Sequence, residues 1–158
     1  MKTLVAYYSR SGRTRVASEK LAGLLGASVE ELREKGVDRS GAMGYMKAGR
    51  DAMQKRAVEL ETLKEDPAAF DLVVLAGPVW AFTVCPAIRA YLAAHAGAIA
   101  RAAFVCTQGG SGAPRAFLEM ERLLGKPPAA TLTLIDKDID HDAFAAEMDT
   151  FILAIEGH

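Results

Sequence analysis

The sequence predicts an α/β protein in which helices cover both faces of a parallel sheet. Five short apolar runs alternate along the chain with segments whose apolar residues recur at helical spacing. Three of these runs consist almost entirely of valine, leucine, alanine and aromatic residues, which is typical of strands buried on both faces. Strands that alternate with helices form parallel sheets with right-handed crossovers, so we expect three layers, α/β/α.

Each of the five apolar runs is assigned to one strand. Thr3 to Tyr8, Leu72 to Ala76 and Ala102 to Cys106 are nearly continuous in apolar residues and fit the interior of the sheet. Ser28 to Leu32 is mixed in polarity, and Ala130 to Ile135 contains an alternation of threonine and leucine. These two runs therefore fit the two edges of the sheet.

The helices between the strands are recognised by their apolar spacing and by their ends. The expected helices are Arg13 to Leu25, Pro86 to Ala94, Pro114 to Leu124 and Asp140 to Ile155. Two of them begin with proline, whose missing N–H is harmless in the first turn. Gly125 is expected to end the third helix, and Asp140 is expected to cap the N-terminus of the last one.

One connection is longer than the others. The second and third strands start 44 residues apart, whereas the other strand starts are separated by 25 to 30 residues. The additional segment, Gly36 to Val58, is rich in glycine, methionine and basic residues, and we expect an irregular stretch followed by a helix from about Ala42 to Arg56. No repeat or linker interrupts the chain, so residues 1–158 are expected to form one domain.

Composition narrows the classes of partner that the chain can have. It carries 19 Lys and Arg against 20 Asp and Glu, a net charge of −1, so no nucleic-acid partner is expected. The long uncharged run between Asp71 and Arg89 is interrupted by glycine and proline, so no membrane crossing is expected. The N-terminus does not resemble an export signal, and we expect a cytoplasmic protein.

Residues that often form metal or nucleophilic sites are sparse. Cys85 and Cys106 are too few for a four-ligand zinc site and are expected to be structural. His95, His141 and His158 do not have the spacing of metal ligands. We therefore expect no metal site and assign no catalytic side chain.

The loop after the first strand has the composition of an anion site. It reads Ser9-Arg10-Ser11-Gly12-Arg13-Thr14 and enters a helix N-terminus, where free N–H groups and the helix dipole favour negative charge. The loop has no Walker lysine and no G-x-G-x-x-G pattern, which favours a single phosphate ester over a triphosphate or a dinucleotide. A simple serine or threonine helix cap is an equally good interpretation of this loop alone.

Two further loops are expected at the same carboxyl edge of the sheet, where parallel sheets bind ligands. The loop from Gly77 to Pro86 could supply an aromatic wall for a flat ligand, although for this loop alone core positions are the favoured interpretation of Trp80 and Phe82. The loop Thr107-Gln108-Gly109-Gly110-Ser111-Gly112 allows backbone N–H groups to approach a heterocycle, or simply makes a tight turn.

Together, the three loops resemble those of the flavodoxin family. Tyr8-Ser9-Arg10-Ser11-Gly12-Arg13-Thr14 matches the family's phosphate loop, an aromatic residue followed by S-x-[ST]-G-x-T, and Gly-Pro-x-Trp resembles its first flavin loop. The resemblance implies a flavodoxin-like fold, a five-stranded parallel sheet in order 2-1-3-4-5, with non-covalently bound FMN. The cofactor-binding residues that it implies are Ser9, Ser11, Gly12 and Thr14 for the phosphate, with Arg10 and Arg13 beside them, and Pro78, Val79, Trp80, Ala81, Phe82 and Thr107 to Gly112 for the two sides of the ring.

The resemblance implies an FMN-binding redox protein that carries electrons or reduces a small acceptor. Four features differ from electron-carrying flavodoxins: the near-neutral charge, the lack of a tyrosine in the second flavin loop, the additional charge of Arg10 and Arg13 in the phosphate loop, and the long Gly36 to Val58 segment. They favour, as an alternative, an NAD(P)H-dependent quinone or flavin oxidoreductase; a non-enzymatic binding module of the same fold is a second alternative.

The expected partner is a redox protein or a small-molecule electron acceptor, and the oligomeric state is left open. The acidic run from Asp136 to Asp140 could contact such a partner. A solvated turn after the last strand is the simpler interpretation of this run.

Overall fold

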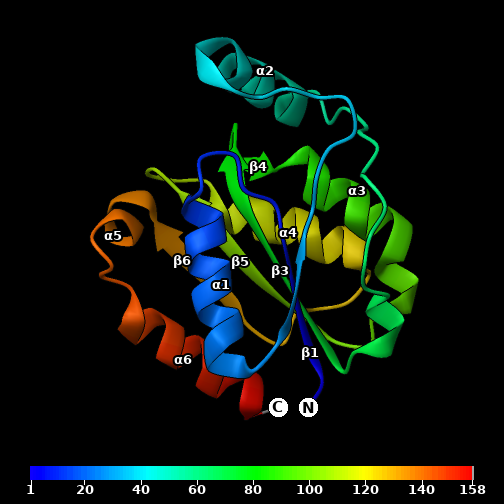
Figure 1. Cartoon of the computed structure of the whole chain (residues 1–158), viewed down its shortest axis with the longest axis vertical. Coiled ribbons are helices and arrows are strands. Elements are labelled where there is room, and N and C mark those ends of the chain that lie inside the picture. The colour runs from blue at the N-terminus through cyan, green and yellow to red at the C-terminus, as the bar shows by residue number, and fades with distance from the viewer. Residues whose placement is uncertain (158) are drawn as a thin grey trace.

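A parallel sheet forms the middle layer of the computed structural model, which describes residues 1–157 (Figure 1). Its parallel strands are β1 (Thr3–Tyr7), β2 (Ser28–Glu31), β3 (Leu72–Trp80), β5 (Ala102–Gln108) and β6 (Thr131–Ile135). They lie in the order β2-β1-β3-β5-β6, which is the expected order 2-1-3-4-5 of the five parallel strands. The mixed and the alternating runs are at the two edges, as their patterns predict.

Helices cover both faces of this sheet. The helices of residues 1–157 are α1 (Arg13–Leu25), α2 (Gly41–Met53), α3 (Pro86–His95), α4 (Ala113–Leu124), α5 (Asp136–Asp140) and α6 (Ala145–Glu156), with short 3-10 turns at Pro67–Ala69 and Ala96–Ala98. In Figure 1, α1 and α6 lie on one face of the sheet and α3 and α4 on the other. The three-layer α/β/α architecture is therefore confirmed.

The two faces of β1 show how the core is divided. Side chains alternate between the faces of a strand. Accordingly, Val5 and Tyr7 are buried against the side covered by α1 and α6, whereas Leu4 and Ala6 are buried on the side covered by α3 and α4. All five residues of β1 are buried, as a run of apolar residues without alternation predicts.

A short antiparallel strand, β4 (Thr83–Val84), was not predicted from the sequence. It pairs with the last two residues of β3, because β3 continues to Trp80 instead of ending at Ala76. The two residues of the hairpin turn, Ala81 and Phe82, have φ angles of 50° and 61°. Such two-residue turns normally contain glycine or asparagine, so their residue types do not reveal this hairpin.

The last helix differs from its expected bounds. The chain forms the short helix α5 directly after β6, so Asp140 ends this helix and does not cap α6. Asp142 then adopts a φ of 52°, and the Ala143 N–H donates to the Asp138 carbonyl 2.7 Å away, which separates α5 from α6. The acidic run from Asp136 to Asp140 is therefore helical and not a solvated turn.

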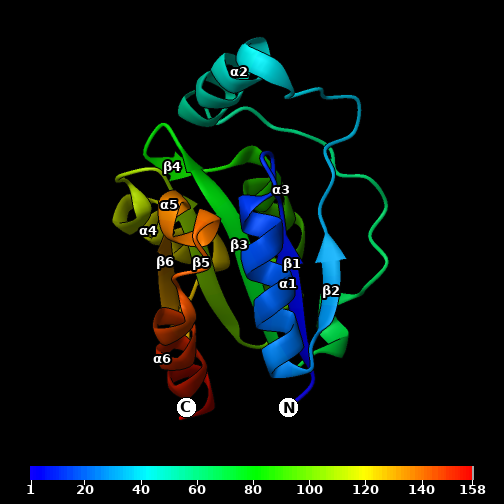
Figure 2. The same cartoon turned by 60° about the vertical axis from the view of Figure 1, so that its left-hand side comes forward.

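The long connection forms an arm that projects beyond the carboxyl edge of the sheet. The strand-like segments that leave and re-enter the body of the protein pair with each other, through Lys35 N–H to the Glu59 carbonyl and Glu61 N–H to the Arg33 carbonyl, both at 2.8 Å. Beyond this pairing the chain forms α2, which lies above the sheet edge in both Figure 1 and Figure 2. The expected irregular stretch followed by a helix is confirmed.

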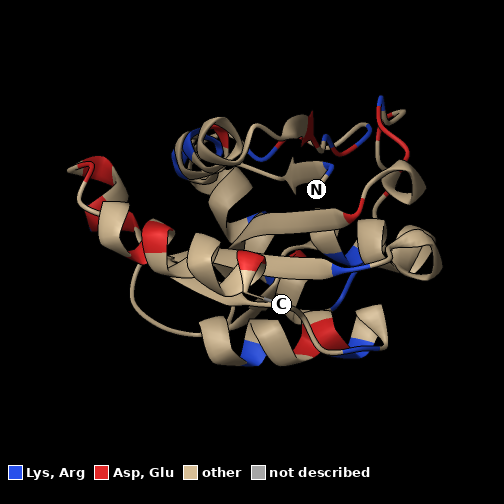
Figure 3. Cartoon of the chain, turned by 90° about the horizontal axis from the view of Figure 1, so that it is seen from below, with Lys and Arg blue, Asp and Glu red and all other residues tan. Residues whose placement is uncertain are grey.

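Charged residues lie mostly on the helices and loops around a largely uncharged sheet (Figure 3). Within residues 1–157, none of the helices has both the length and the apolar character that crossing a membrane requires. Cys85 and Cys106 are buried free thiols in the core, and burial raises the pKa of Cys85 to about 12. Both cysteines are thus structural, as expected.

An ion cluster joins α3 to α4. The carboxylate of Glu119 on α4 accepts hydrogen bonds from Arg122 of the same helix and from Arg89 on α3. These donors outweigh the effect of partial burial and lower the pKa of Glu119 from 4.5 to about 2. The stability that this carboxylate contributes is therefore fully present above about pH 4.5 and is lost as the pH falls towards 2.

We expect Glu119→Gln to lower the free energy of unfolding by about 1–3 kcal/mol at pH 7, since hydrogen bonds to charged groups contribute about that much. Below pH 4.5 the difference between variant and wild type should narrow progressively. Urea unfolding from pH 7 to pH 3 measures both effects. Glu19→Gln, on the exposed face of α1, is the matched control. A difference that stays constant with pH would contradict the assigned pKa.

Candidate functional site

The order of the strands creates a hollow at the carboxyl edge of the sheet. β1 lies between β2 and β3, and the chain leaves β1 for α1 on one face but leaves β3 for α3 on the other. The loops after β1 and β3 consequently diverge, and such points are where open parallel sheets bind ligands. A cavity of about 380 Å³ lies there, which is within the range of small-molecule sites.

All three loops singled out from the sequence contribute to this cavity, which we call the edge cavity. The predicted residues that line it are Arg10, Ser11, Arg13, Thr14, Pro78, Val79, Trp80, Ala81, Thr107, Gln108 and Gly109. The predicted residues that do not line it are Ser9, Gly12, Phe82, Gly110, Ser111 and Gly112. The three predicted loops therefore converge on one cavity, but only some of their residues face it and the others shape the loops.

The first loop presents the uncapped N-terminus of α1. Gly12, at the N-cap, has a φ of 98°, a conformation that favours glycine, and no side chain caps the helix. The Ser9 hydroxyl accepts a hydrogen bond from the Gly12 N–H at 3.1 Å and so stabilises the turn. The first-turn N–H groups and the positive end of the helix dipole are left for an anion beside Ser11 and Thr14.

The third loop is organised by two side chains. Gln108 accepts a hydrogen bond from the Ala113 N–H at 2.8 Å, at the start of α4, and donates to the Gly110 carbonyl at 3.3 Å. The hydroxyl of Thr107 lies 2.8 Å from that of Thr14 in a buried hydrogen bond. This bond joins the first loop to the third, so the two loops have a fixed separation.

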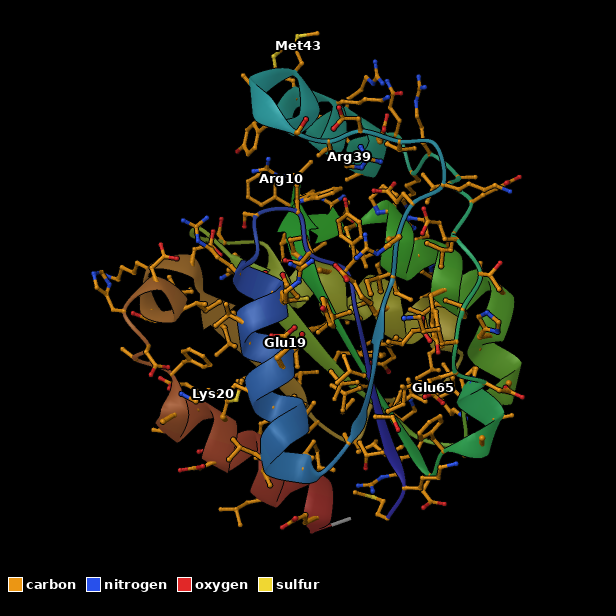
Figure 4. All side chains as sticks on the ribbon, viewed as in Figure 1. Arg10, Glu19, Lys20, Arg39, Met43 and Glu65 are labelled. Atoms are coloured by element: carbon orange, nitrogen blue, oxygen red, sulfur yellow. The ribbon has the colours of Figure 1, made fainter. Side chains whose placement is uncertain are left out.

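The two arginines of the first loop have different environments. Arg13 donates to both carboxylate oxygens of Asp140, at 2.9 and 3.0 Å, and its guanidinium lies 3.6 Å from Asp136. Its charge is therefore largely balanced by α5. Arg10 instead lies under α2, where its guanidinium is 5.3 Å from the centre of the Tyr45 ring (Figure 4). Arg10 is thus the less constrained of the two cations at the cavity.

Trp80 forms an aromatic wall at the end of β3. Its ring meets the Tyr8 ring edge-on at a centroid distance of 5.5 Å, and the guanidinium of Arg39 lies 5.2 Å from its centroid. Trp80 is only partly buried, so part of it remains available to the cavity. Phe82 is 57% exposed and lies outside the edge cavity, so neither aromatic residue is simply a core residue.

A buried ion network anchors the arm. Arg39 is only 5% exposed and donates two hydrogen bonds to Glu34, at 2.6 and 2.7 Å, and one to Asp51 on α2, at 3.0 Å. Burial opposes the charge of Asp51, but the hydrogen bonds from Arg39 and Arg50 outweigh it and lower the pKa of Asp51. Arg39 therefore connects the base of the arm, α2 and Trp80, and Figure 4 shows it beneath α2.

Four residues of the edge cavity were missed by sequence reasoning. Tyr45, Ala48 and Gly49 come from α2, and Asp136 comes from the start of α5. The spacing of the first three puts them on one helical face, and the acidic run after β6 lies at the carboxyl edge of the sheet. These signals existed, but the position of α2 over the sheet was not deducible from them.

The first turn of α2 packs closely against the segment that precedes it. A Cβ on Gly44 would lie 2.0 Å from the carbonyl carbon of Arg39, so only glycine fits where α2 starts.

Asp136 lines the edge cavity at the start of α5. Burial raises the pKa of its carboxyl group, although Arg13 acts in the opposite direction. The edge cavity thus has a roof from α2 and one acidic side chain on its rim.

The sequence model of a known family matches most of the chain. The model, described as Flavodoxin, matches residues 2–146, which include all three loops. The chain belongs to the flavodoxin family. No curated protein sequence is significantly similar to it.

Solved structures share the fold at low sequence identity. A flavoprotein from Lactobacillus acidophilus NCFM, determined in complex with FMN, is 21% identical with a TM-score of 0.73, over 89% of this chain and 97% of its own. A protein from Bacteroides eggerthii DSM 20697 is 22% identical with a TM-score of 0.75, over 96% and 98%. A flavodoxin from the domain Archaea is 15% identical with a TM-score of 0.56, over 99% and 98%. The flavodoxin fold therefore extends over nearly the whole chain.

We expect the ion network of Arg39, Glu34 and Asp51 to hold α2 in place. Arg39→Leu leaves Glu34 and Asp51 without their buried partner, which typically costs about 3–5 kcal/mol. We expect the amide protection of α2 to fall by at least about 100-fold in hydrogen exchange, with the central strands much less affected. Arg33→Leu removes a largely exposed arginine and serves as the control. Unchanged protection of α2 in Arg39→Leu would contradict this role of the network.

Proposed function

We propose that the chain binds FMN non-covalently in the edge cavity and acts as a redox protein of the flavodoxin type, carrying electrons or reducing a small acceptor. The observation that carries this proposal is that all three loops resembling the family's flavin-binding loops line one cavity at the point where the strand order reverses. The family assignment and the FMN complex of the Lactobacillus acidophilus protein support it. A cytoplasmic location, where buried thiols stay reduced, is part of the proposal.

The first loop has the groups that a phosphate requires. Ser11 offers a hydroxyl donor, Thr14 offers a second one when the Thr107 hydroxyl donates to it, and the uncapped N-terminus of α1 offers backbone N–H groups and a positive dipole end. Gly12 has the left-handed backbone that brings the loop into position, and Ser9 stabilises the turn. Arg10 supplies the nearby positive charge, whereas Arg13 is engaged with Asp140.

The remaining walls suit a flat ring with a polar chain. Pro78, Val79, Trp80 and Ala81 line one side, and the backbone of the third loop lies on another. Asp136 can accept hydrogen bonds from the hydroxyl groups of a sugar-alcohol chain. When bound, FMN would supply the one- and two-electron chemistry, and the protein would control its binding and its access to solvent.

Tyr45 is proposed to cover the ring from above. The third loop has no aromatic residue, whereas α2 places the Tyr45 ring at the edge cavity beside Arg10. Ala48 and Gly49 lie one helical turn further along the same face, where their small side chains leave room for a ligand. The arm would thus provide the aromatic contact that the third loop lacks.

An NAD(P)H-dependent quinone or flavin oxidoreductase is the second candidate function. It is favoured by the near-neutral charge of the chain and by the long arm, whose helix α2 contributes Tyr45, Ala48 and Gly49 to the edge cavity. Steady oxidation of NAD(P)H in the presence of a quinone, without an added reductase, would support the enzyme. Oxidation only with an added reductase would support the carrier.

Replacement of both phosphate-loop hydroxyls tests FMN binding. Ser11→Ala with Thr14→Ala removes two donors, each contributing about 1.5–3 kcal/mol to a charged group, so we expect the Kd for FMN to rise by at least about 100-fold. Flavin fluorescence titration measures the Kd, and circular dichroism checks the fold. Ser28→Ala with Thr150→Ala is the matched control away from the edge cavity. A Kd within twofold of wild type, or no FMN binding by the wild type, would reject the proposal.

The role of Tyr45 is tested by the rate of FMN release. Aromatic contacts contribute about 0.5–1.5 kcal/mol, so Tyr45→Ala should release FMN up to about tenfold faster, while Tyr45→Phe should resemble wild type. Met43→Ala changes an exposed residue on the outer side of the same helix and is the control (Figure 4). Stopped-flow fluorescence measures these rates. Equal rates for Tyr45→Ala and Met43→Ala would exclude Tyr45 as a cover.

A further inference from the structure

A second cavity of about 590 Å³ lies on the other side of the β3–β4 hairpin tip. The end of α2, the tip of the hairpin and one face of α4 line it. Ala81 lines both this cavity and the edge cavity, so the hairpin tip separates the two. We call it the hairpin cavity. None of its lining residues belongs to the proposed phosphate loop, Ser9 to Thr14.

The hairpin cavity has an exposed apolar floor. Met53, Phe82 and Leu118 come from three separate elements, and they are 69%, 57% and 68% exposed. Large apolar side chains that are exposed singly are common, but a group of them in one hollow indicates a binding surface. These three side chains therefore form one apolar surface that a ligand can contact.

The backbone fixes the position of Phe82. Its φ of 61° lies in the left-handed region, which bulky residues rarely adopt. A Cβ on Gly112 would lie 2.9 Å from the Phe82 Cα, so the third loop supports the hairpin tip where only a glycine fits. Local strain of this kind persists where the surrounding structure enforces it, and it is frequent at ligand sites.

The rim of the hairpin cavity is cationic. Lys55, Arg115 and Arg122 surround it, and the one carboxylate among its lining residues is that of Glu119. Glu119 is already engaged with Arg122, with Lys55 at 3.7 Å and with Arg89 on α3. Among residues 1–157, by contrast, no carboxylate forms an ion pair with Arg115. The rim therefore carries a surplus of positive charge and one guanidinium that can bind an anion.

We propose that the hairpin cavity binds a small organic anion with a flat apolar body. The body would lie on Phe82, Leu118 and Met53, and its carboxylate, sulfonate or phosphate group would pair with Arg115. The volume fits a small molecule, whereas a protein interface requires a broader surface. Because the hairpin tip alone separates the two cavities, such a ligand would lie next to whatever occupies the edge cavity. The proposal does not depend on FMN binding.

A pair of matched probes tests the role of charge. Isothermal titration calorimetry of the full chain with 2-naphthoate and with its neutral analogue 2-naphthamide compares the same ring with and without charge. We expect saturable binding of one 2-naphthoate per chain, at least about tenfold tighter than 2-naphthamide and weaker at high salt. Equal affinities for the two probes, or no saturable binding of 2-naphthoate, would overturn the proposal.

Variants of both cavities locate the bound probe. Arg115→Gln should weaken 2-naphthoate binding about tenfold without changing the Kd for FMN, and Leu118→Ala should weaken both naphthyl probes. Arg33→Gln, which removes an exposed arginine elsewhere, should leave the affinity unchanged. Ser11→Ala with Thr14→Ala should leave 2-naphthoate binding intact. Loss of 2-naphthoate binding in that double variant but not in Arg115→Gln would place the probe in the edge cavity and refute the proposal.

Discussion

The position of the arm, and with it the roof of the edge cavity, depends on the buried guanidinium of Arg39. A buried charge is stable only when it is paired and hydrogen-bonded, and here the partners come from two different places, Glu34 at the base of the arm and Asp51 on α2. Satisfying this one charge therefore determines where α2 lies. The same guanidinium contacts the Trp80 ring, so the roof and one wall of the edge cavity are positioned by a single side chain. The cavity is thus a property of the arm as much as of the sheet.

The sheet supplies the other constraint. Reversal of strand order beside β1 opens the carboxyl edge, and the extension of β3 into the hairpin with β4 divides the opened region into two hollows. The division is maintained by residues in unfavourable backbone conformations, Ala81 and Phe82, which the third loop supports through Gly112. Polar groups gather on the α1 side of the hairpin, whereas large exposed apolar residues gather on the α4 side. One hairpin therefore separates two different chemical environments.

Features with a local signal were predictable from the sequence. The bounds of α1 were predicted correctly because its apolar residues recur at helical spacing, and the three loops were located because each directly follows a strand. Features that depend on distant partners were not. The helix from Asp136 to Asp140 contacts Arg13, 127 residues away from Asp140 in the sequence, and without that partner the run resembles a turn. Tyr45 was missed because its place over the sheet depends on the buried ion pairs of Arg39, which no sequence spacing reveals.

The way the arm joins the body has a consequence for how this protein can be altered. Lys35 and Glu59 are joined by a backbone hydrogen bond, so the segment between them begins and ends at the same place. A two-residue turn can bridge antiparallel neighbours of this kind. The arm is therefore an interchangeable module: it can be excised, or exchanged for one from a relative, while the sheet and the three loops keep their connectivity. Because the arm contributes Tyr45 to the edge cavity and Met53 and Lys55 to the hairpin cavity, such a transplant would change the lining of both cavities together.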